Sequence, residues 1–187
     1  MNQENVSLTA FAHQWILKNA TNFQFAVDAT CGNGLDSVFL AKNTTGKLFC
    51  FDIQEEAIQN TKAKLLQNHL HCQYQLIHDS HENIKQYIDT LSIDVAMMNL
   101  GYLPHGDHSI TTTHTSTMKA LDEIHKQLKG VMTILCYPGH AQGKIETQAV
   151  AKWIATLDSK QWTIETKRAL HPDSPILYCL KKTCVDL

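Results

Sequence analysis

The sequence predicts an α/β protein whose sheet has seven strands, mostly parallel, with helices on both faces. Two observations predict it. Short apolar, β-rich runs alternate with stretches of helical periodicity along most of the chain. The last two apolar runs, however, are separated by a connection too short for a crossover helix, and such a connection makes an antiparallel hairpin. A chain of 187 residues is expected to form one domain over 1–187.

The expected strands are short apolar runs bounded by polar or glycine-containing segments. They span 23–29, 47–53, 72–78, 93–100, 131–137, 162–167 and 176–181. The expected helices cover 34–42, 55–68, 82–88, 113–128 and 143–157. In 55–68, for example, Ala57, Ile58 and Leu65 recur at helical spacing near one face. Gly130 is expected to stop the helix 113–128.

The two ends of the chain complete this pattern. Segment 1–22 carries apolar Phe11, Trp15 and Ile16 and is expected to form a helix that covers the sheet. At the other end, 162–167 and 176–181 are expected to form the antiparallel hairpin at one edge. Five parallel strands followed by such a hairpin are typical of class I (Rossmann-like) methyltransferases.

Composition excludes several classes of protein. The 16 basic and 18 acidic side chains give a formal net charge of -2, which excludes binding of nucleic acid by bulk positive charge but leaves room for a local lysine patch. No apolar run approaches the ~20 residues of a membrane span, and the N-terminus lacks a signal-peptide pattern. The six cysteines form no CxxC pair. We therefore expect a cytoplasmic protein with reduced thiols.

The segment after the first expected strand carries the most informative motif. Asp28 ends the strand, Gly32 and Gly34 follow, and a helix begins. Glycines let backbone approach a ligand closely, and a helix N-terminus offers free N–H groups. Ser37 stands where the dinucleotide fingerprint has its third glycine, and no P-loop lysine follows. A carboxylate at Asp28 suits a ligand with an ammonium and a sulfonium, such as S-adenosylmethionine; the alternative is a structural turn capped by Asp28.

The ends of the second and third strands offer further polar groups. Asp52 lies roughly 20 residues after Asp28, the position where a carboxylate grips a ribose diol. An N-cap for the helix that begins at Gln54 is the alternative role of Asp52. After the third strand, Asp79 or the pair Ser80 and His81 can meet an adenine edge or a ribose, or cap the loop.

The fourth strand ends in a polar residue followed by an aromatic one, Asn99 and Tyr102. Amine methyltransferases place Asn/Asp-Pro-Pro-aromatic at this point: the amide oxygen orients a nitrogen nucleophile, and the aromatic ring stacks on a base. Here Leu100 and Gly101 replace the prolines, so the match is partial. The alternative is a plain strand-end asparagine with a buried Tyr102.

Two polar loops, 104–114 and 137–146, follow strands four and five at the edge of the sheet where ligands bind. The expected substrate-binding residues are Leu103, His105, Thr112, His114 and His140. The histidine spacing matches no helical H-x-x-x-H site, so no metal is expected. A helix cap is the alternative explanation for Gly143 and Glu146.

Together these motifs resemble the rRNA methylase family of small bacterial class I methyltransferases. The resemblance rests on Asp28-Ala-Thr-x-Gly-Asn-Gly, Asn99-Leu-Gly-Tyr-Leu-Pro, the Ser109-Ile-Thr-Thr run and Gly139-His-x-x-Gly-x-x-Glu146, and it covers nearly the whole chain. More narrowly, the sequence resembles the Gram-positive tRNA methyltransferases that convert 5-aminomethyl-2-thiouridine at the wobble position into its 5-methylaminomethyl form.

The resemblance implies an S-adenosylmethionine-dependent homodimer that methylates an amine on a tRNA anticodon stem-loop. No membrane partner is expected. The implied contacts to the methyl donor are Asn33, Asp36, Asp52, Gln54, Ser80 and His81. Asn99 and Tyr102 are the expected catalytic residues. Phosphate contacts are expected from Lys119, Lys126, Lys129 and Lys144, the first three on one helix face, together with His105, His108, His114 and His140. The alternative for these lysines is a solvated helix face. The alternatives are methylation of rRNA or of a small amine, and, in a different class, a nucleotide-binding module or an NAD oxidoreductase.

Overall fold

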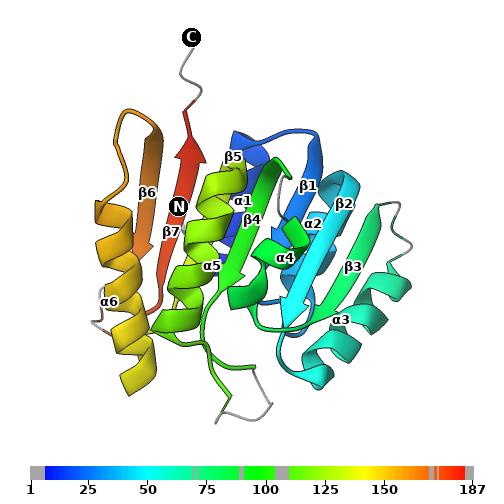
Figure 1. Ribbon diagram of the computed structural model, residues 1–187, viewed down its shortest axis with the longest axis horizontal. Helices are drawn as coiled ribbons and strands as arrows, with labels where there is room; N and C mark the ends of the chain where they lie inside the picture. The colour runs from blue at the N-terminus through cyan, green and yellow to red at the C-terminus, as the bar shows by residue number, and fades with distance from the viewer. Residues whose placement is uncertain are drawn as a thin grey trace, which may run out of the picture.

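One seven-stranded sheet organises the molecule, and helices cover both of its faces (Figure 1). The computed structural model describes residues 7–68, 70, 72–88, 91–103, 110–168, 171 and 173–183. The strands are β1 (Phe23–Asp28), β2 (Thr44–Asp52), β3 (Gln73–His78), β4 (Ile93–Asn99), β5 (Leu128–Cys136), β6 (Trp162–Arg168) and β7 (Ile176–Lys182). The helices are α1 (Leu8–Asn19), α2 (Leu35–Asn43), α3 (Glu55–Gln67), η1 (His81–Asn83), α4 (Lys85–Ile88), α5 (His114–Gln127) and α6 (Ala141–Ala155). In the described part of the chain, none of these helices has the length and apolar composition needed to cross a membrane.

The strand order is β3-β2-β1-β4-β5-β7-β6, which confirms the predicted class I methyltransferase architecture. β1 to β5 are parallel to one another, whereas β7 runs antiparallel to both β5 and β6. From β1 the strand order runs through β2 to β3 toward one edge of the sheet, and from β4 it runs through β5 toward the other edge. β1 and β4 lie side by side where the order reverses. In doubly wound sheets this switch point opens a crevice at the carboxyl ends of the strands.

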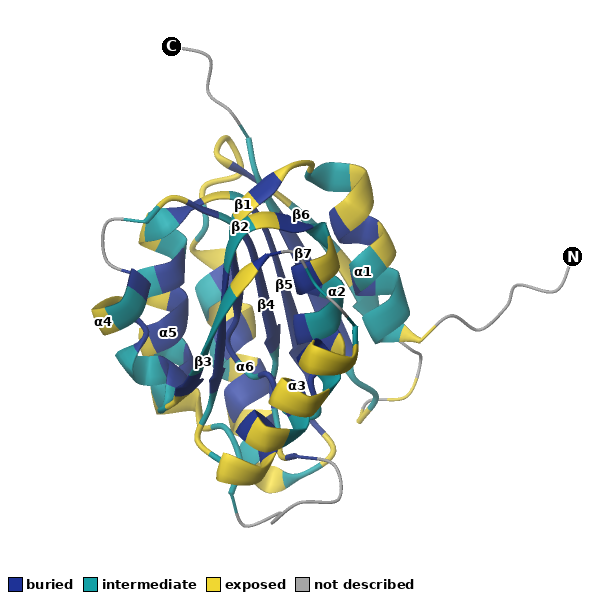
Figure 2. Ribbon diagram, turned by 90° about the vertical axis from the view of Figure 1, so that its right-hand side faces the viewer, coloured by how far each residue is buried: buried dark blue, intermediate teal, exposed yellow. Residues whose placement is uncertain are grey.

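The strands bury both faces of the sheet, because successive side chains point to opposite sides. Val27, Phe51 and Met98 belong to a core that includes residues of α5 and α6. On the other face, Ala26 and Leu48 belong to a second core with residues of α1, α2 and α3. Figure 2 shows the central strands in the colour of buried residues between these two layers. The central strands β1, β4 and β5 therefore have mostly apolar sequences, whereas the edge strand β6 alternates between apolar and polar residues.

The N-terminal covering helix expected within 1–22 is α1. It begins after Ser7, whose hydroxyl accepts a hydrogen bond from the Ala10 N–H at 3.2 Å. Trp15 and Ile16 are buried in the core of this face. The Trp15 indole N–H donates to Glu165 of β6 at 2.9 Å, which ties α1 to the edge of the sheet.

Two expected helices differ from the structure at their ends. The segment expected as one helix over 82–88 is divided into the 3-10 turn η1 and the short helix α4. The helix expected over 143–157 begins two residues earlier, at Ala141, because the His140 side chain accepts from the Gly143 N–H at 3.1 Å and caps it. This places His140 at the entrance of α6, beside the carboxyl ends of the strands.

The prediction that Gly130 stops α5 is wrong. α5 ends at Gln127 and passes directly into β5, which contains Gly130. A Cβ at Gly130 would lie 2.1 Å from the backbone oxygen of Asp94 in the neighbouring strand β4. The glycine is required because β5 and β4 approach closely here, and not as a helix terminator.

Substitution Gly130→Ala is therefore expected to destabilise the fold by about 1–3 kcal/mol, the usual cost of forcing extra volume into a packed interior. Urea unfolding of both proteins measures the difference. Gly139→Ala is the matched control, because a Cβ there meets its nearest atom only at 4.0 Å. Equal midpoints for wild type and Gly130→Ala would contradict this account.

Candidate active site

A cavity of about 560 Å³ opens at the carboxyl ends of the parallel strands, over the switch point between β1 and β4. The segments that follow all five parallel strands contribute to its wall. The predicted site residues that line it are Gly32, Asn33, Asp36, Asp52, Gln54, Ser80, His81, Asn99, Tyr102, Leu103, Thr112 and His140. The volume is in the range of sites that hold small-molecule ligands.

Three of the predicted site residues do not line this cavity. Asp28 and Gly34 lie behind the loop that follows β1, and His114 is an exposed residue at the first position of α5. His105, a predicted substrate-binding residue, lies outside the described residues.

Asp28 is buried beneath the loop, with only 1% of its surface exposed. One carboxylate oxygen accepts from the Ser37 hydroxyl at 2.6 Å, and the other accepts from the Thr30 N–H at 3.3 Å. Burial, with a further contribution from the nearby charge of Asp36, raises the pKa of Asp28 to about 8. The expectation that Asp28 faces a ligand's ammonium is corrected: it holds the loop that forms the cavity wall.

Gly34 acts through packing between helices. It is the N-cap of α2 and has a φ of 77°, a backbone conformation that favours glycine. A Cβ at this position would lie 2.8 Å from the Cα of Thr61 in α3. The neighbouring Asn33 accepts a hydrogen bond from Asn60 of α3 at 3.1 Å. The beginning of α2 is thus docked on α3, which leaves Asn33 and Asp36 at the cavity.

The Asp52 carboxylate is held in place by backbone donors. The N–H of Gly32 donates to Oδ2 and the N–H of Gln54 donates to Oδ1, each at 3.0 Å. Asp52 therefore holds the backbone just before α3, but the N-cap of α3 is Gln54, so the alternative role of Asp52 as an N-cap is wrong. Each oxygen keeps a second lone pair for hydroxyl donors in the cavity. Burial raises the pKa of this carboxyl above its usual value.

His81 lines the cavity and has one buried ring nitrogen without a partner among the described residues. It is 7% exposed, and burial lowers its pKa to about 4. One ring nitrogen hydrogen-bonds the backbone of Ala29, whereas Nε2 is buried with no hydrogen-bond partner among the described residues. In a neutral imidazole that donates from one nitrogen, the other nitrogen accepts. The cavity lining as a whole, with the Asp52 carboxylate and the backbone before α2, fits the adenosyl group of S-adenosylmethionine.

Asn99 and Tyr102 are fixed by backbone contacts at the end of β4. The Asn99 N–H donates to the hydroxyl of Thr30 at 2.7 Å, so the loops after β1 and β4 are joined. Tyr102 pairs with Thr111 in an isolated antiparallel bridge. The alternative of a buried Tyr102 is wrong, because 44% of this residue is exposed. Its ring centre lies 5.8 Å from that of His140, at a tilt of 49°.

Glu146, for which a helix cap was the alternative expected from the sequence, lies behind the cavity wall and holds Thr112, which lines it. It is 2% exposed and accepts from the hydroxyls of Thr112 at 2.8 Å and Thr117 at 2.6 Å. Thr112 in turn accepts from the Gly101 N–H at 2.8 Å. Glu146 shares its helix face with the buried Val150, and one acid on an apolar stripe is the signal that could have found it.

Tyr137 was also missed as a site residue. It follows β5, lines the cavity with 37% of its surface exposed, and its side chain is hydrogen-bonded to Asn99. Burial and the charge of Asp36 raise its pKa. The sequence places an aromatic residue at the end of this strand but gives no sign that its hydroxyl reaches the neighbouring strand.

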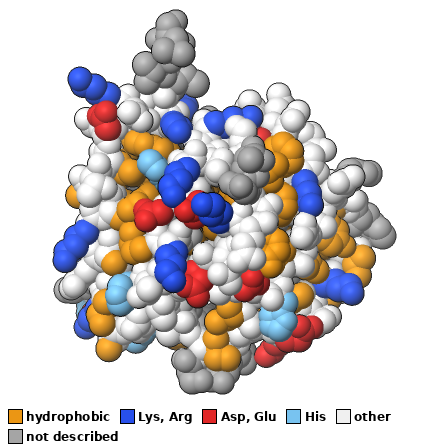
Figure 3. Space-filling model, viewed as in Figure 1, with side chains coloured by type: hydrophobic (Ala, Val, Ile, Leu, Met, Phe, Trp, Pro, Cys, Tyr) orange, Lys and Arg blue, Asp and Glu red, His pale blue; other side chains and the backbone are white. Residues whose placement is uncertain are grey.

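Each of the four lysines expected to contact phosphate forms an ion pair with a carboxylate. The four lysine–carboxylate pairs are Lys119–Glu82 at 2.8 Å, Lys126–Glu123 at 2.7 Å, Lys129–Asp94 at 3.1 Å and Lys144–Asp173 at 3.2 Å. Lys129 lies in β5, so the expectation that it shares a helix face with Lys119 and Lys126 is wrong. Figure 3 shows basic and acidic side chains next to one another on the face it presents.

Comparison with known proteins gives concordant results. Residues 48–181 match the family described as "Putative rRNA methylase". The tRNA (mnm(5)s(2)U34)-methyltransferase of Arabidopsis thaliana, a chloroplast protein, is 29% identical over 171 residues, which are 83% of this chain. This chain spans only 62% of the length of that relative.

Two solved structures resemble the whole described fold. A putative rRNA-methylase from Clostridium thermocellum is 35% identical, with a TM-score of 0.88 and coverage of 98% of this chain and 100% of that one. A putative methyltransferase from Streptococcus mutans, solved in complex with S-adenosylhomocysteine, is 30% identical, with a TM-score of 0.83 and the same coverage.

The strand order and the cavity over the switch point define a class I, S-adenosylmethionine-dependent methyltransferase. Since the family model covers more than half of the sequence, the chain belongs to the rRNA methylase family. The rival classes, a nucleotide-binding module and an NAD oxidoreductase, are not supported.

Burial of Asp28 predicts a particular dependence of stability on pH. Its pKa is about 8 in the folded protein against an ordinary value of 3.8, so between these values the folded state holds an extra proton. The stability contributed by Asp28 is present below pH about 4 and is lost as the pH rises toward about 8, by at most ~1.4 kcal/mol per pH unit. Asp28→Asn, which does not ionise, should therefore gain stability relative to wild type as the pH rises. Urea unfolding of both proteins across this pH range gives the difference in their free energies of unfolding, from which the contributions of the other titrating groups cancel. A difference that stays constant with pH would contradict the burial argument.

Proposed function

We propose that the protein transfers the methyl group of S-adenosylmethionine to the primary amine of 5-aminomethyl-2-thiouridine at the wobble position of tRNA. The observation that carries the proposal is the amide of Asn99 in the cavity wall, next to the exposed ring of Tyr102. An amide and an aromatic ring at this edge suit a nucleophilic nitrogen attached to a base. The product in the name of the Arabidopsis relative supports the same substrate.

Asn99 would orient the amine. Its backbone is held by the hydroxyl of Thr30 at 2.7 Å, and the next N–H, that of Leu100, donates to the Leu135 carbonyl at 2.8 Å. An amide oxygen fixed in this way accepts one N–H of the amine and leaves the nitrogen lone pair directed into the cavity. The bound cofactor supplies a methyl group on a sulfonium, whose thioether leaves with the bonding electron pair.

The amine must lose a proton before it can attack. In water a primary amine is an ammonium, and removal from water disfavours that charged form. The cavity wall near Asn99 contains the apolar Leu100 and Leu103, which are 2% and 5% exposed. This environment favours the neutral amine, which is the nucleophilic form.

The wobble base would be held by aromatic side chains at the opening. Tyr102 and Tyr137 line the cavity and are 44% and 37% exposed, and His140 lies next to Tyr102. A base turned out of an anticodon loop can stack on such rings, a contact worth about 1–3 kcal/mol per base. Because the nearby lysines are ion-paired, we infer that stacking contributes more to recognition than phosphate contacts do.

The proposed ribose acceptor predicts a loss of cofactor affinity. Asp52→Ala should weaken binding of S-adenosylhomocysteine by about 1–3 kcal/mol, because a charged hydrogen-bond acceptor is removed. Isothermal titration calorimetry measures the affinity. Glu56→Ala, which removes an exposed carboxylate from the same helix start, should bind as wild type does. Unchanged affinity in the Asp52 variant would remove this residue from the cofactor site.

The proposed reaction is tested with anticodon stem-loops that carry either 5-aminomethyl-2-thiouridine or unmodified uridine. Mass spectrometry of the nucleosides should find one added methyl group only on the first RNA. Asn99→Ala should lower turnover by roughly 10²-fold while cofactor affinity is retained, because orientation of the amine is lost. Asn68→Ala, at the far end of α3, is the control. Methylation of only rRNA fragments or small amines, or wild-type turnover in Asn99→Ala, would contradict the proposal.

A further inference from the structure

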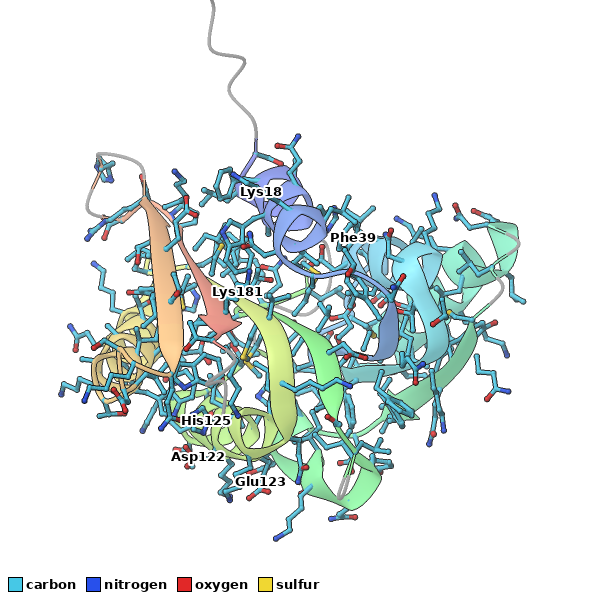
Figure 4. The ribbon with its side chains drawn as sticks, turned by 90° about the horizontal axis from the view of Figure 1, so that it is seen from above. Lys18, Phe39, Asp122, Glu123, His125 and Lys181 are labelled. Carbon is cyan, nitrogen blue, oxygen red and sulfur yellow. The ribbon has the colours of Figure 1, made fainter. Side chains whose placement is uncertain are left out.

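The covering helix α1 contributes a side chain that reaches the wall of the cavity. His13 of α1 stacks on Phe39 of α2, with ring centres 3.9 Å apart and planes at 4°. Figure 4 shows Phe39 next to α1. The stacking directs Nε2 of His13 to Oδ1 of Asp36, at 2.6 Å. Both partners are largely shielded, with 23% and 9% of their side chains exposed.

Asp36 links this histidine to Asn99. Its second oxygen, Oδ2, accepts from the side-chain nitrogen of Asn99 at 3.5 Å. The side chain of Tyr137 is hydrogen-bonded to the same asparagine. A continuous chain of contacts therefore runs from α1 through α2 to the ends of β4 and β5, and Asp36, Asn99 and Tyr137 all line the cavity.

This chain decides which way the Asn99 amide faces. A carboxylate oxygen accepts hydrogen bonds and does not donate them, so Asp36 requires the NH₂ group of Asn99 on its side. A flipped amide would set two acceptors against each other, which costs the hydrogen bond and adds repulsion. With the nitrogen directed to Asp36, the amide oxygen of Asn99 is left as the acceptor for a substrate N–H.

His13 gives Asp36 a fixed position. Asp36 stands in the first turn of α2, where the positive end of the helix dipole attracts a carboxylate. A donor N–H on the opposite side, at 2.6 Å, holds one oxygen of Asp36 toward α1 and leaves the other for Asn99. Without that donor, the carboxylate is free to turn to its own helix.

We propose that His13 is a positioning residue: by holding Asp36, it fixes the Asn99 amide with its oxygen toward the substrate amine. This inference rests on the proposed function, because it assigns the amine as the group that Asn99 orients. It also gives α1 a part in the reaction beyond covering the sheet.

Two substitutions separate the hydrogen bond from the packing. His13→Phe keeps a ring to stack on Phe39 but has no N–H for Asp36, whereas His13→Gln restores an N–H donor. We expect His13→Phe to lower kcat by about tenfold at saturating cofactor and RNA, with cofactor affinity within about twofold of wild type. His13→Gln should recover most of kcat. In an Asn99→Ala background, His13→Phe should have no further effect, because the two residues act in one chain.

A second readout requires neither substrate nor cofactor. In protein with isotope-labelled asparagine, the side-chain amide signal of Asn99, assigned by its loss in Asn99→Ala, should shift in His13→Phe and return in His13→Gln. An unshifted signal, or equal loss of kcat in both His13 variants, would overturn the inference, as would a loss confined to cofactor affinity. Failure of wild type to methylate the aminomethyl RNA would instead overturn the proposed function, and the amide signal would still test the contact between His13, Asp36 and Asn99.

Discussion

The buried carboxyl group of Asp28 is the constraint on which the rest of the site depends. It accepts from Thr30 and from Ser37, so it fixes both ends of the loop between β1 and α2. The Thr30 hydroxyl then receives the Asn99 N–H. A single carboxyl group beneath the sheet edge thereby fixes the positions of the loop after β1 and of Asn99 relative to each other. Its cost is the burial of an ionisable group, visible in a pKa raised to about 8.

The same arrangement recurs around the cavity. Asp52 reaches back to the N–H of Gly32, and Glu146 holds Thr112, which holds Gly101. In each case a polar side chain ties one loop to the next instead of facing solvent. Sites whose groups are fixed before the ligand arrives lose less free energy when they are used. The parallel sheet makes this possible because it brings the ends of five strands to one edge.

The sequence could predict the features that depend on hydrophobic periodicity and on polar residues at the ends of strands. The strands, most helices, and the cavity position of Asp52 and Asn99 follow from apolar runs that end in polar residues. It could not predict contacts made across the fold. Burial of Asp28 and the glycine required at 130 depend on a neighbouring helix or strand. The reach of His13 to Asp36 joins residues of two helices, and no local pattern records it.

The unpartnered nitrogen of His81 has a consequence for the stability of the fold itself. Nε2 is enclosed by protein and finds no hydrogen-bond partner among the described residues. A buried polar atom without a partner costs roughly 1–3 kcal/mol of folding free energy. Burial also lowers the pKa of this imidazole to about 4, so the ring is neutral near pH 7 and the unmet atom is a dipole and not a charge. A contact that reached this nitrogen would therefore make the folded protein more resistant to unfolding.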